Sequence, residues 1–342
     1  MEEMKDTRKR FSQLALMFLA GTIIIYAVQL LVSNLVALVK PEWLENPDIS
    51  LTISVVPMYL IGMPLLILLV RRIPATVIEH RSMKLWQFLL AIVMCFCVMY
   101  CSNFLGIAIT TVIGILKGSM VNNVILDVVS GTSLITNVLY MVICAPIMEE
   151  LIFRKLIVDR TVRYGQGTAV LLSGLMFGLF HGNLNQFVYA FTIGMFFAFL
   201  YVKTGQIKYT IGIHMIVNFF GSIVSMWMME AMNYEGYMEA VSAGAGMDEL
   251  MQLVMDYLPG WIAYMVYLCM IMAMVIAGIV LFIVFRKRFA LTAGAVQLPK
   301  GSRFKTVFLN VGMLLYCAFW IAEIVLQLFD NSFILMIYSL FR

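Results

Sequence analysis

The stretch Leu134–Val158 reads "LITNVLYMVICAPIMEELIFRKLIV" and places four charged residues inside an otherwise apolar run. These residues are Glu149, Glu150, Arg154 and Lys155. Apolar runs of about 20 residues are typical of helices that span a membrane. A charged side chain in the hydrocarbon costs about 3 kcal/mol. The stretch therefore predicts a membrane bundle whose charged groups belong to a functional site.

The composition of the whole chain supports this fold class. Of the 342 residues, 63% are hydrophobic and 12% are charged, whereas a soluble domain is about half apolar and a quarter charged. We expect an all-α polytopic membrane protein with no soluble domain and no nucleic-acid partner. The six cysteines lie in apolar segments without a CxxC pair, so they are interpreted as reduced, small hydrophobic residues: Cys95, Cys97, Cys101, Cys144, Cys269 and Cys317.

About eight or nine transmembrane helices are predicted from the apolar stretches. The nine stretches are 11–39, 51–70, 86–116, 133–160, 168–184, 186–203, 208–229, 260–285 and 306–329. The fifth and sixth are short, which is typical of helix ends that lie around a cavity inside a bundle. We divide the chain into N-terminal transmembrane helices (1–132), a catalytic helical core (133–229), and an outer loop with the C-terminal transmembrane helices (230–342).

The basic residues are distributed unequally between the two sides of these spans. The N-terminal tail, the loops 71–85, 203–208 and 286–305, and the segment 154–163 hold 20 of the 23 Lys and Arg residues. Lys40, Lys117 and Arg342 fall on the other side, with the acidic outer loop 230–259, whose "MDELMQLVMDYL" is interpreted as an interfacial amphipathic segment. The positive-inside rule then predicts a cytoplasmic N-terminus. The many methionines and compact loops favour a bacterial cell membrane.

Residues four apart on a helix share a face, whereas adjacent residues diverge by about 100°. Glu150 and Arg154 are therefore expected to form an ion pair. Glu149 points elsewhere and has no obvious local partner, so it is free for chemistry. The alternative is that both glutamates only neutralise Arg154 and a neighbouring helix.

The segment "FGLFH" places Phe177 one helical turn before His181. Three glycines at a spacing of four, Gly174, Gly178 and Gly182, indicate close helix packing. The alternative role for His181 is that of a hydrogen-bonding connector between helices.

The segment "HMIVN" places His214 and Asn218 four residues apart on one helix face. Two donors on one face suit a developing oxyanion, and the alternative is interhelical hydrogen bonding. Of the other candidates, His80 lies in a charged loop and is expected to be solvated, and Glu323 in the last span is interpreted as structural or snorkelling.

Counting 1.5 Å per residue places Glu149, His181, His214 and Asn218 at similar depths inside the hydrocarbon. Together they permit peptide or amide hydrolysis, with Glu149 as general base, His181 holding the water, and His214 with Asn218 binding the oxyanion. Two His and one Glu also form a catalytic zinc set. Because no HExxH is present and an amide is a poor zinc ligand, a site without a cofactor is favoured and zinc is the alternative.

Three ordered motifs resemble those of the CPBP family of intramembrane endopeptidases, which includes CAAX prenyl proteases and bacteriocin-processing (Abi) proteins. The motifs are Glu149-Glu150-x-x-x-Arg154, Phe177-x-x-x-His181 and His214-x-x-x-Asn218. The resemblance covers about 145–220. It implies an α-helical membrane endopeptidase in which Glu149 and His181 handle the water, His214 and Asn218 serve the oxyanion, and Arg154 supports them.

The expected substrate is a peptide or protein that reaches the site from the membrane or the cytoplasmic side. In a bacterium, small peptides or the ends of membrane proteins are better candidates than prenylated proteins. Two alternatives use the same Glu and His residues: a membrane transporter with a proton relay, and a non-enzymatic immunity or scaffold protein.

Overall fold

Helices make up all the regular structure in the computed structural model, which describes residues 2–119, 121, 123–299 and 301–329. The predicted all-α fold is confirmed. Arg342 and the end of the predicted C-terminal region 230–342 lie outside the described residues. The N-terminal half contains α1 (Glu2–Val39), η1 (Pro41–Leu44), α2 (Pro47–Pro57), η2 (Met58–Gly62), α3 (Met63–Val70), α4 (Leu85–Lys117) and α5 (Val124–Gly131).

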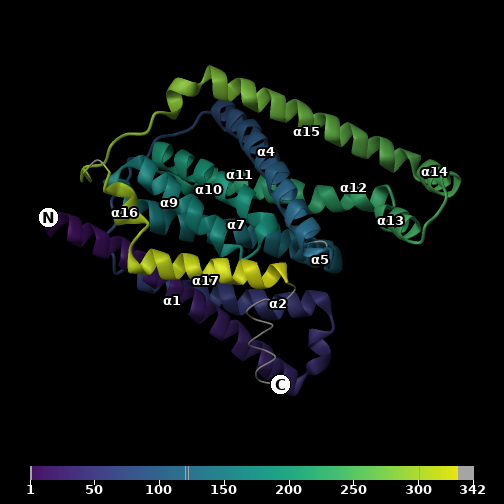
Figure 1. Ribbon diagram of the computed structural model, residues 1–342, viewed down its shortest axis with the longest axis horizontal. Coiled ribbons are helices and arrows are strands. Elements are labelled where there is room, and N and C mark those ends of the chain that lie inside the picture. The colour runs from purple at the N-terminus through teal and green to yellow at the C-terminus, as the bar shows by residue number, and fades with distance from the viewer. Residues whose placement is uncertain (1, 120, 122, 300, 330–342) are drawn as a thin grey trace.

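The central part forms the middle of the bundle in Figure 1. It contains α6 (Leu134–Asn137), η3 (Val138–Cys144), α7 (Ala145–Glu149), η4 (Glu150–Val158), α8 (Asp159–Thr161), η5 (Val162–Tyr164), α9 (Gln166–Phe180), α10 (Leu184–Thr204), α11 (Ile207–Asn218), η6 (Phe219–Val224) and α12 (Ser225–Ala231). The C-terminal part contains α13 (Tyr234–Ser242), α14 (Met247–Asp256), α15 (Leu258–Val284), η7 (Arg286–Phe289), α16 (Arg303–Val307) and α17 (Val311–Leu328).

Eight helices of the described chain are long and apolar enough to cross a membrane. They are Met4–Val39, Pro47–Val70, Leu85–Lys117, Leu134–Tyr164, Leu184–Thr204, Ile207–Ala231, Leu258–Val284 and Val311–Leu328. Each corresponds to one of the predicted stretches, so the estimate of eight or nine is confirmed at eight.

The remaining predicted stretch, 168–184, forms a shorter helix. Helix α9 has 15 residues, or about 22 Å at 1.5 Å per residue, less than the roughly 30 Å of hydrocarbon. It ends at Phe180 with His181 as its C-terminal cap, and Gly182 then adopts a left-handed conformation with φ of +64°. Most residues of α9 are buried, so this helix ends against protein.

Helices α9 and α10 form a tightly packed hairpin. A Cβ added at Gly174 would lie 2.4 Å from Met195 Cγ, and one at Gly178 would lie 2.8 Å from Phe191 Cβ. The predicted glycine packing is therefore confirmed for these two positions. Gly182 instead faces α17, because its Cβ would meet Trp320 and Glu323 at 3.2 Å.

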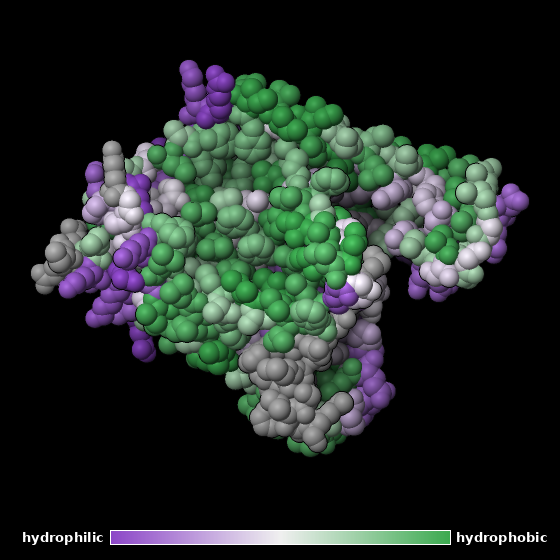
Figure 2. All heavy atoms as spheres, viewed as in Figure 1, coloured by the Kyte–Doolittle hydropathy of each residue, from purple (hydrophilic) through white to green (hydrophobic). Residues whose placement is uncertain are grey.

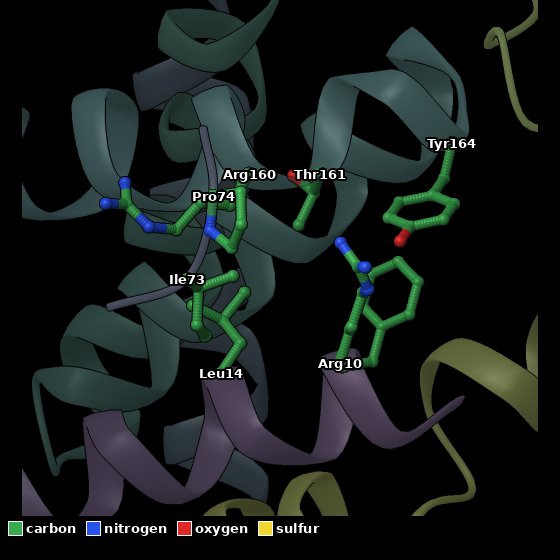
Figure 3. A pocket seen from close by; sticks show the side chains of 8 residues that line it. Arg10, Leu14, Ile73, Pro74, Arg160, Thr161 and Tyr164 are labelled. Carbon is green, nitrogen blue, oxygen red and sulfur yellow. The ribbon is translucent and has the colours of Figure 1, made fainter. Parts of the chain in front are cut away.

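The predicted basic segments meet at one end of the bundle. Arg160 Nε donates to Val70 O at 2.9 Å, Gln206 Nε2 donates to Arg81 O at 2.9 Å, and Lys203 Nζ donates to Ala290 O at 2.6 Å. Figure 2 shows hydrophilic residues at both ends of the molecule and a hydrophobic band between them. Figure 3 shows a small pocket at this basic end, lined by Arg10, Phe11, Leu14, Ile73, Pro74, Arg160, Thr161 and Tyr164.

The acidic helices α13 and α14 lie at the opposite end of the view in Figure 1. Helix α14 exposes Met247, Met251 and Met255 at a spacing of four residues. This apolar stripe fits the interfacial segment expected from the sequence. The cytoplasmic placement of the basic end stays a prediction.

Candidate active site

A buried ion pair lies at the centre of the bundle. Arg154 Nη2 is 2.9 Å from Glu150 Oε1, and both side chains are fully buried. The predicted pairing of these two residues is confirmed. Burying two charges is tolerated only when each compensates the other, so this pair must form for the segment η4 to pack inside the protein.

Aromatic rings cover the guanidinium of Arg154. Its Cζ lies 4.4 Å from the ring centroid of Phe177 and 5.3 Å from that of Phe197. A weakly hydrated planar cation stacks well on such rings. Phe197 was not expected from the sequence, since it is one of three phenylalanines in "MFFAF" and carries no polar signal.

His214 of α11 contacts both glutamates. Its Nδ1 lies 3.0 Å from Glu150 Oε1, and its Nε2 lies 3.6 Å from Glu149 Oε2. The expectation that Glu149 has no partner holds only within its own helix, because α11 brings His214 to it. The imidazole is 3% exposed and packs against Phe197 at 5.2 Å between ring centroids.

The two adjacent glutamates differ in exposure. The side chain of Glu149 is 19% exposed, whereas that of Glu150 is fully buried. Glu149 is the last residue of α7, and the wider π-helical segment η4 begins at Glu150. Such π segments inside α-helices are frequent at functional sites. The buried carboxylate has two cationic or donor partners, and the more exposed one remains accessible.

His181 lies at the C-terminal cap of α9. Its Nδ1 is 2.9 Å from the backbone oxygen of Phe177, one turn earlier. Because a carbonyl oxygen only accepts, Nδ1–H is the donor. The ring of Phe177 contacts the imidazoles of both His181 and His214, at 4.8 and 5.9 Å between centroids. The predicted supporting role of Phe177 thus corresponds to a position between the two histidines.

Asn218 is the last residue of α11, directly before the π-helical segment η6. Its Nδ2 donates to the backbone oxygen of Met141 at 2.8 Å. This bond fixes the amide between η3 and α11. In the structure, His214 contacts the two glutamates, whereas Asn218 donates to η3. The sequence analysis expected both side chains to face one oxyanion, so these additional partners were not predicted.

The segment that contains all these residues matches a known family. Residues 131–220 match the family described as Type II CAAX prenyl endopeptidase Rce1-like. This segment is Rce1-like. The resemblance drawn from the three motifs is thereby confirmed: residues 131–220 are similar to this family of endopeptidases.

A relative supports the same assignment. The Bacillus subtilis (strain 168) protein named "Putative membrane peptidase YdiL" is 34% identical over 127 residues, which cover 36% of this chain and 49% of the relative. The chain therefore aligns with about half the length of this curated relative. No solved structure matches the chain.

A catalytic zinc ion needs three protein side chains whose donor atoms meet at one point. Within the described residues, no group of three or more His, Cys, Asp or Glu side chains is arranged to hold a metal ion. The carboxylate of Glu150 is already paired with Arg154 at 2.9 Å, and that fixed positive charge opposes a divalent cation beside it. Glu150 is thus engaged by Arg154, and the choice between a metal-free site and zinc stays a prediction.

Proposed function

We propose that this protein is an intramembrane endopeptidase that hydrolyses peptide bonds of membrane-associated proteins or small peptides. One observation carries the proposal: inside the Rce1-like segment, a partly exposed carboxylate, Glu149, lies 3.6 Å from a buried imidazole, His214. Placing a carboxylate and an imidazole inside a membrane protein costs free energy, so their presence there indicates a function.

In the proposed reaction, Glu149 is the general base. Its side chain is 19% exposed, so a water molecule and a peptide can approach it, while the buried Glu150 is held by Arg154. Glu149 removes a proton from the water as the water oxygen attacks the peptide carbonyl carbon. His181, whose Nδ1 is bound to Phe177 O, presents Nε2 to the same water.

Asn218 and His214 are proposed to serve the oxyanion. The amide of Asn218 has two N–H groups, and its bond to Met141 O uses one of them. The second N–H can donate to the oxygen that becomes negative in the transition state. No serine or cysteine nucleophile takes part in this scheme, and no metal is required by it.

The proposed substrates reach the site from the membrane or from the cytoplasmic side. The Rce1-like family is described by its action on CAAX prenyl proteins. In a bacterial membrane, we expect small peptides or the terminal segments of membrane proteins instead. The lipid bilayer is the surrounding partner of the eight candidate spans.

Peptide cleavage in proteoliposomes tests the proposal. Candidate membrane peptides are incubated with the parent protein and with Glu149→Gln and His181→Ala, and products are identified by mass spectrometry. General-base catalysis contributes about 10²- to 10⁴-fold, so Glu149→Gln is expected to lower kcat by that factor. Glu323→Gln, the same change at a buried carboxylate in α17, serves as the matched control and is expected to retain activity.

Three outcomes oppose parts of this proposal. Cleavage at the parental rate by both variants would overturn the catalytic assignment. Activity that is lost on chelation and restored by Zn²⁺ would overturn the metal-free scheme. Ion-coupled uptake into liposomes without cleavage of any peptide would favour the transporter instead.

A further inference from the structure

His214 is the side chain that connects the two glutamates, and its two ring nitrogens face different carboxylates. Nδ1 lies 3.0 Å from Glu150 Oε1, and Nε2 lies 3.6 Å from Glu149 Oε2. A neutral imidazole carries one N–H, and the partner of one nitrogen decides what the other nitrogen can do. The location of this hydrogen therefore determines the chemistry that His214 can perform.

The contacts of Glu150 locate the hydrogen. Glu150 Oε1 is also 2.9 Å from Arg154 Nη2, inside a site where both charged side chains are fully buried. A guanidinium has only donors, so Glu150 is present as a carboxylate that accepts. An acceptor at 3.0 Å requires that His214 Nδ1 carries the hydrogen.

The opposite tautomer conflicts with this arrangement. With the hydrogen on Nε2, the Nδ1 lone pair would face a carboxylate oxygen at 3.0 Å. Two buried acceptors at that distance repel each other, and leaving a buried polar atom without a partner costs about 1–3 kcal/mol. By RT ln K, this penalty favours the Nδ1–H tautomer by about 5- to 150-fold.

We propose that Glu150 is a positioning residue that fixes His214 in the Nδ1–H tautomer, so that Nε2 accepts the proton that Glu149 removes from water. The mechanistic half of this inference rests on the proposed function. The tautomer itself depends only on the contacts among Glu150, Arg154 and His214. His214 then becomes a donor to the oxyanion only after it has taken up the water's proton.

The proton can be followed through the reaction. As the water oxygen forms the C–O bond, its proton moves to Glu149 and the carbonyl π pair moves to the oxygen. Nε2 of His214 takes that proton from Glu149, and Nδ1–H of the resulting imidazolium stays bound to Glu150. The C–N bond breaks as the oxyanion collapses, and Nε2–H protonates the leaving nitrogen. Water has then added OH to the acyl product and H to the amine.

Nitrogen NMR of the imidazoles tests the tautomer without any substrate. The chain has three histidines, so ¹⁵N-histidine-labelled protein in micelles gives three imidazole spin systems, and His214→Gln assigns that of His214. We expect hydrogen on Nδ1 and a lone pair on Nε2. A hydrogen on Nε2 in the parent protein would overturn the proposal.

Glu150→Gln tests whether Glu150 fixes the tautomer of His214. The Gln amide can also donate, so the hydrogen of His214 is expected to distribute between Nδ1 and Nε2. An unchanged tautomer would contradict the positioning role. Should the single variant not fold because Arg154 is left unpaired, Glu150→Gln combined with Arg154→Met removes the uncompensated charge and provides the same readout.

Kinetics separate this role from a merely structural one. Because Glu150 does not touch the substrate in this scheme, Glu150→Gln is expected to lower kcat about 10²-fold or more with little change in KM. A shifted tautomer with parental kcat would overturn the catalytic half of the inference. The absence of cleavage by the parent would overturn the proposed function while leaving the tautomer result standing.

Discussion

Helices α10 and α15 are both apolar spans, yet they occupy opposite environments. In its most apolar window, α10 is 56% buried, whereas α15 is 17% buried. Three of the eight spans in the described chain have a lower mean hydropathy than the others. These spans contain Glu149, His214 and Phe197, the last of which covers Arg154. The most apolar span, α15, is thus the least buried one, and the three least apolar spans carry the residues of the candidate site. In this bundle, charged residues and closely packed glycines, more than hydropathy, indicate which helices lie inside.

The largest loss of stability is expected when the buried ion pair between Glu150 and Arg154 is broken. Arg154→Met leaves Glu150 buried without its cation, which costs about 3–5 kcal/mol. The matched control is Arg81→Met, because Arg81 pairs with Glu79 at 2.8 Å while both side chains are mostly exposed, and such pairs contribute about 0–1 kcal/mol. The Tm of each variant is measured by thermal unfolding in micelles, and Arg154→Met is expected to lower it more than Arg81→Met does. An equal decrease of Tm in the two variants would show that the buried ion pair contributes no more to stability than the exposed one.

A smaller effect is expected at the contact between α9 and α10. Gly178→Ala introduces a Cβ 2.8 Å from Phe191 Cβ, and overpacking of this kind costs about 1–3 kcal/mol. Gly221→Ala is the control, since its Cβ would meet nothing within 4 Å. Tm is expected to fall for the first variant and to stay or rise for the second. A stable Gly178→Ala protein would show that the hairpin can separate without loss.

The smallest effect is expected on the outer helix. Ile276 in α15 is 58% exposed, and Ile276→Val is expected to change stability by less than about 0.5 kcal/mol. Ile193 in α10 is 2% exposed, and Ile193→Val there is expected to cost about 0.5–1.5 kcal/mol. Unfolding curves of the two variants, measured under the same conditions, give the change in the free energy of unfolding for each. An Ile276→Val loss as large as that of Ile193→Val would indicate a packed partner on α15.

Hydropathy was sufficient to predict the spans, because lipid imposes length and apolarity on every crossing helix. It did not predict that α9 stops after 15 residues. The end of α9 depends on the left-handed Gly182 and on its contact with α17. A glycine in an apolar run gives no sign of which conformation it adopts, since it also serves close packing.

The site was predictable where one helix determines it. The spacing of Glu150 and Arg154 indicates their pairing, because both lie one turn apart on the same segment. The contact between Glu149 and His214 depends on how two helices meet, and periodicity within each helix does not report this. The π-helical segments that begin at Glu150 and after Asn218 also lack a sequence signal. The roles assigned to Glu149, His181, His214 and Asn218 stay predictions.

Helix α17 has a consequence for where this protein can be divided. It lies outside the matched residues 131–220, yet Tyr316 OH donates to Met176 O at 2.9 Å, and Trp320 packs on Phe180 at 5.2 Å between ring centroids. It thus supports α9 along the side that leads to His181. The segment that matches the family is therefore smaller than the set of helices that pack around the candidate site. An engineer who transplants residues 131–220 into another membrane scaffold must supply a substitute for α17.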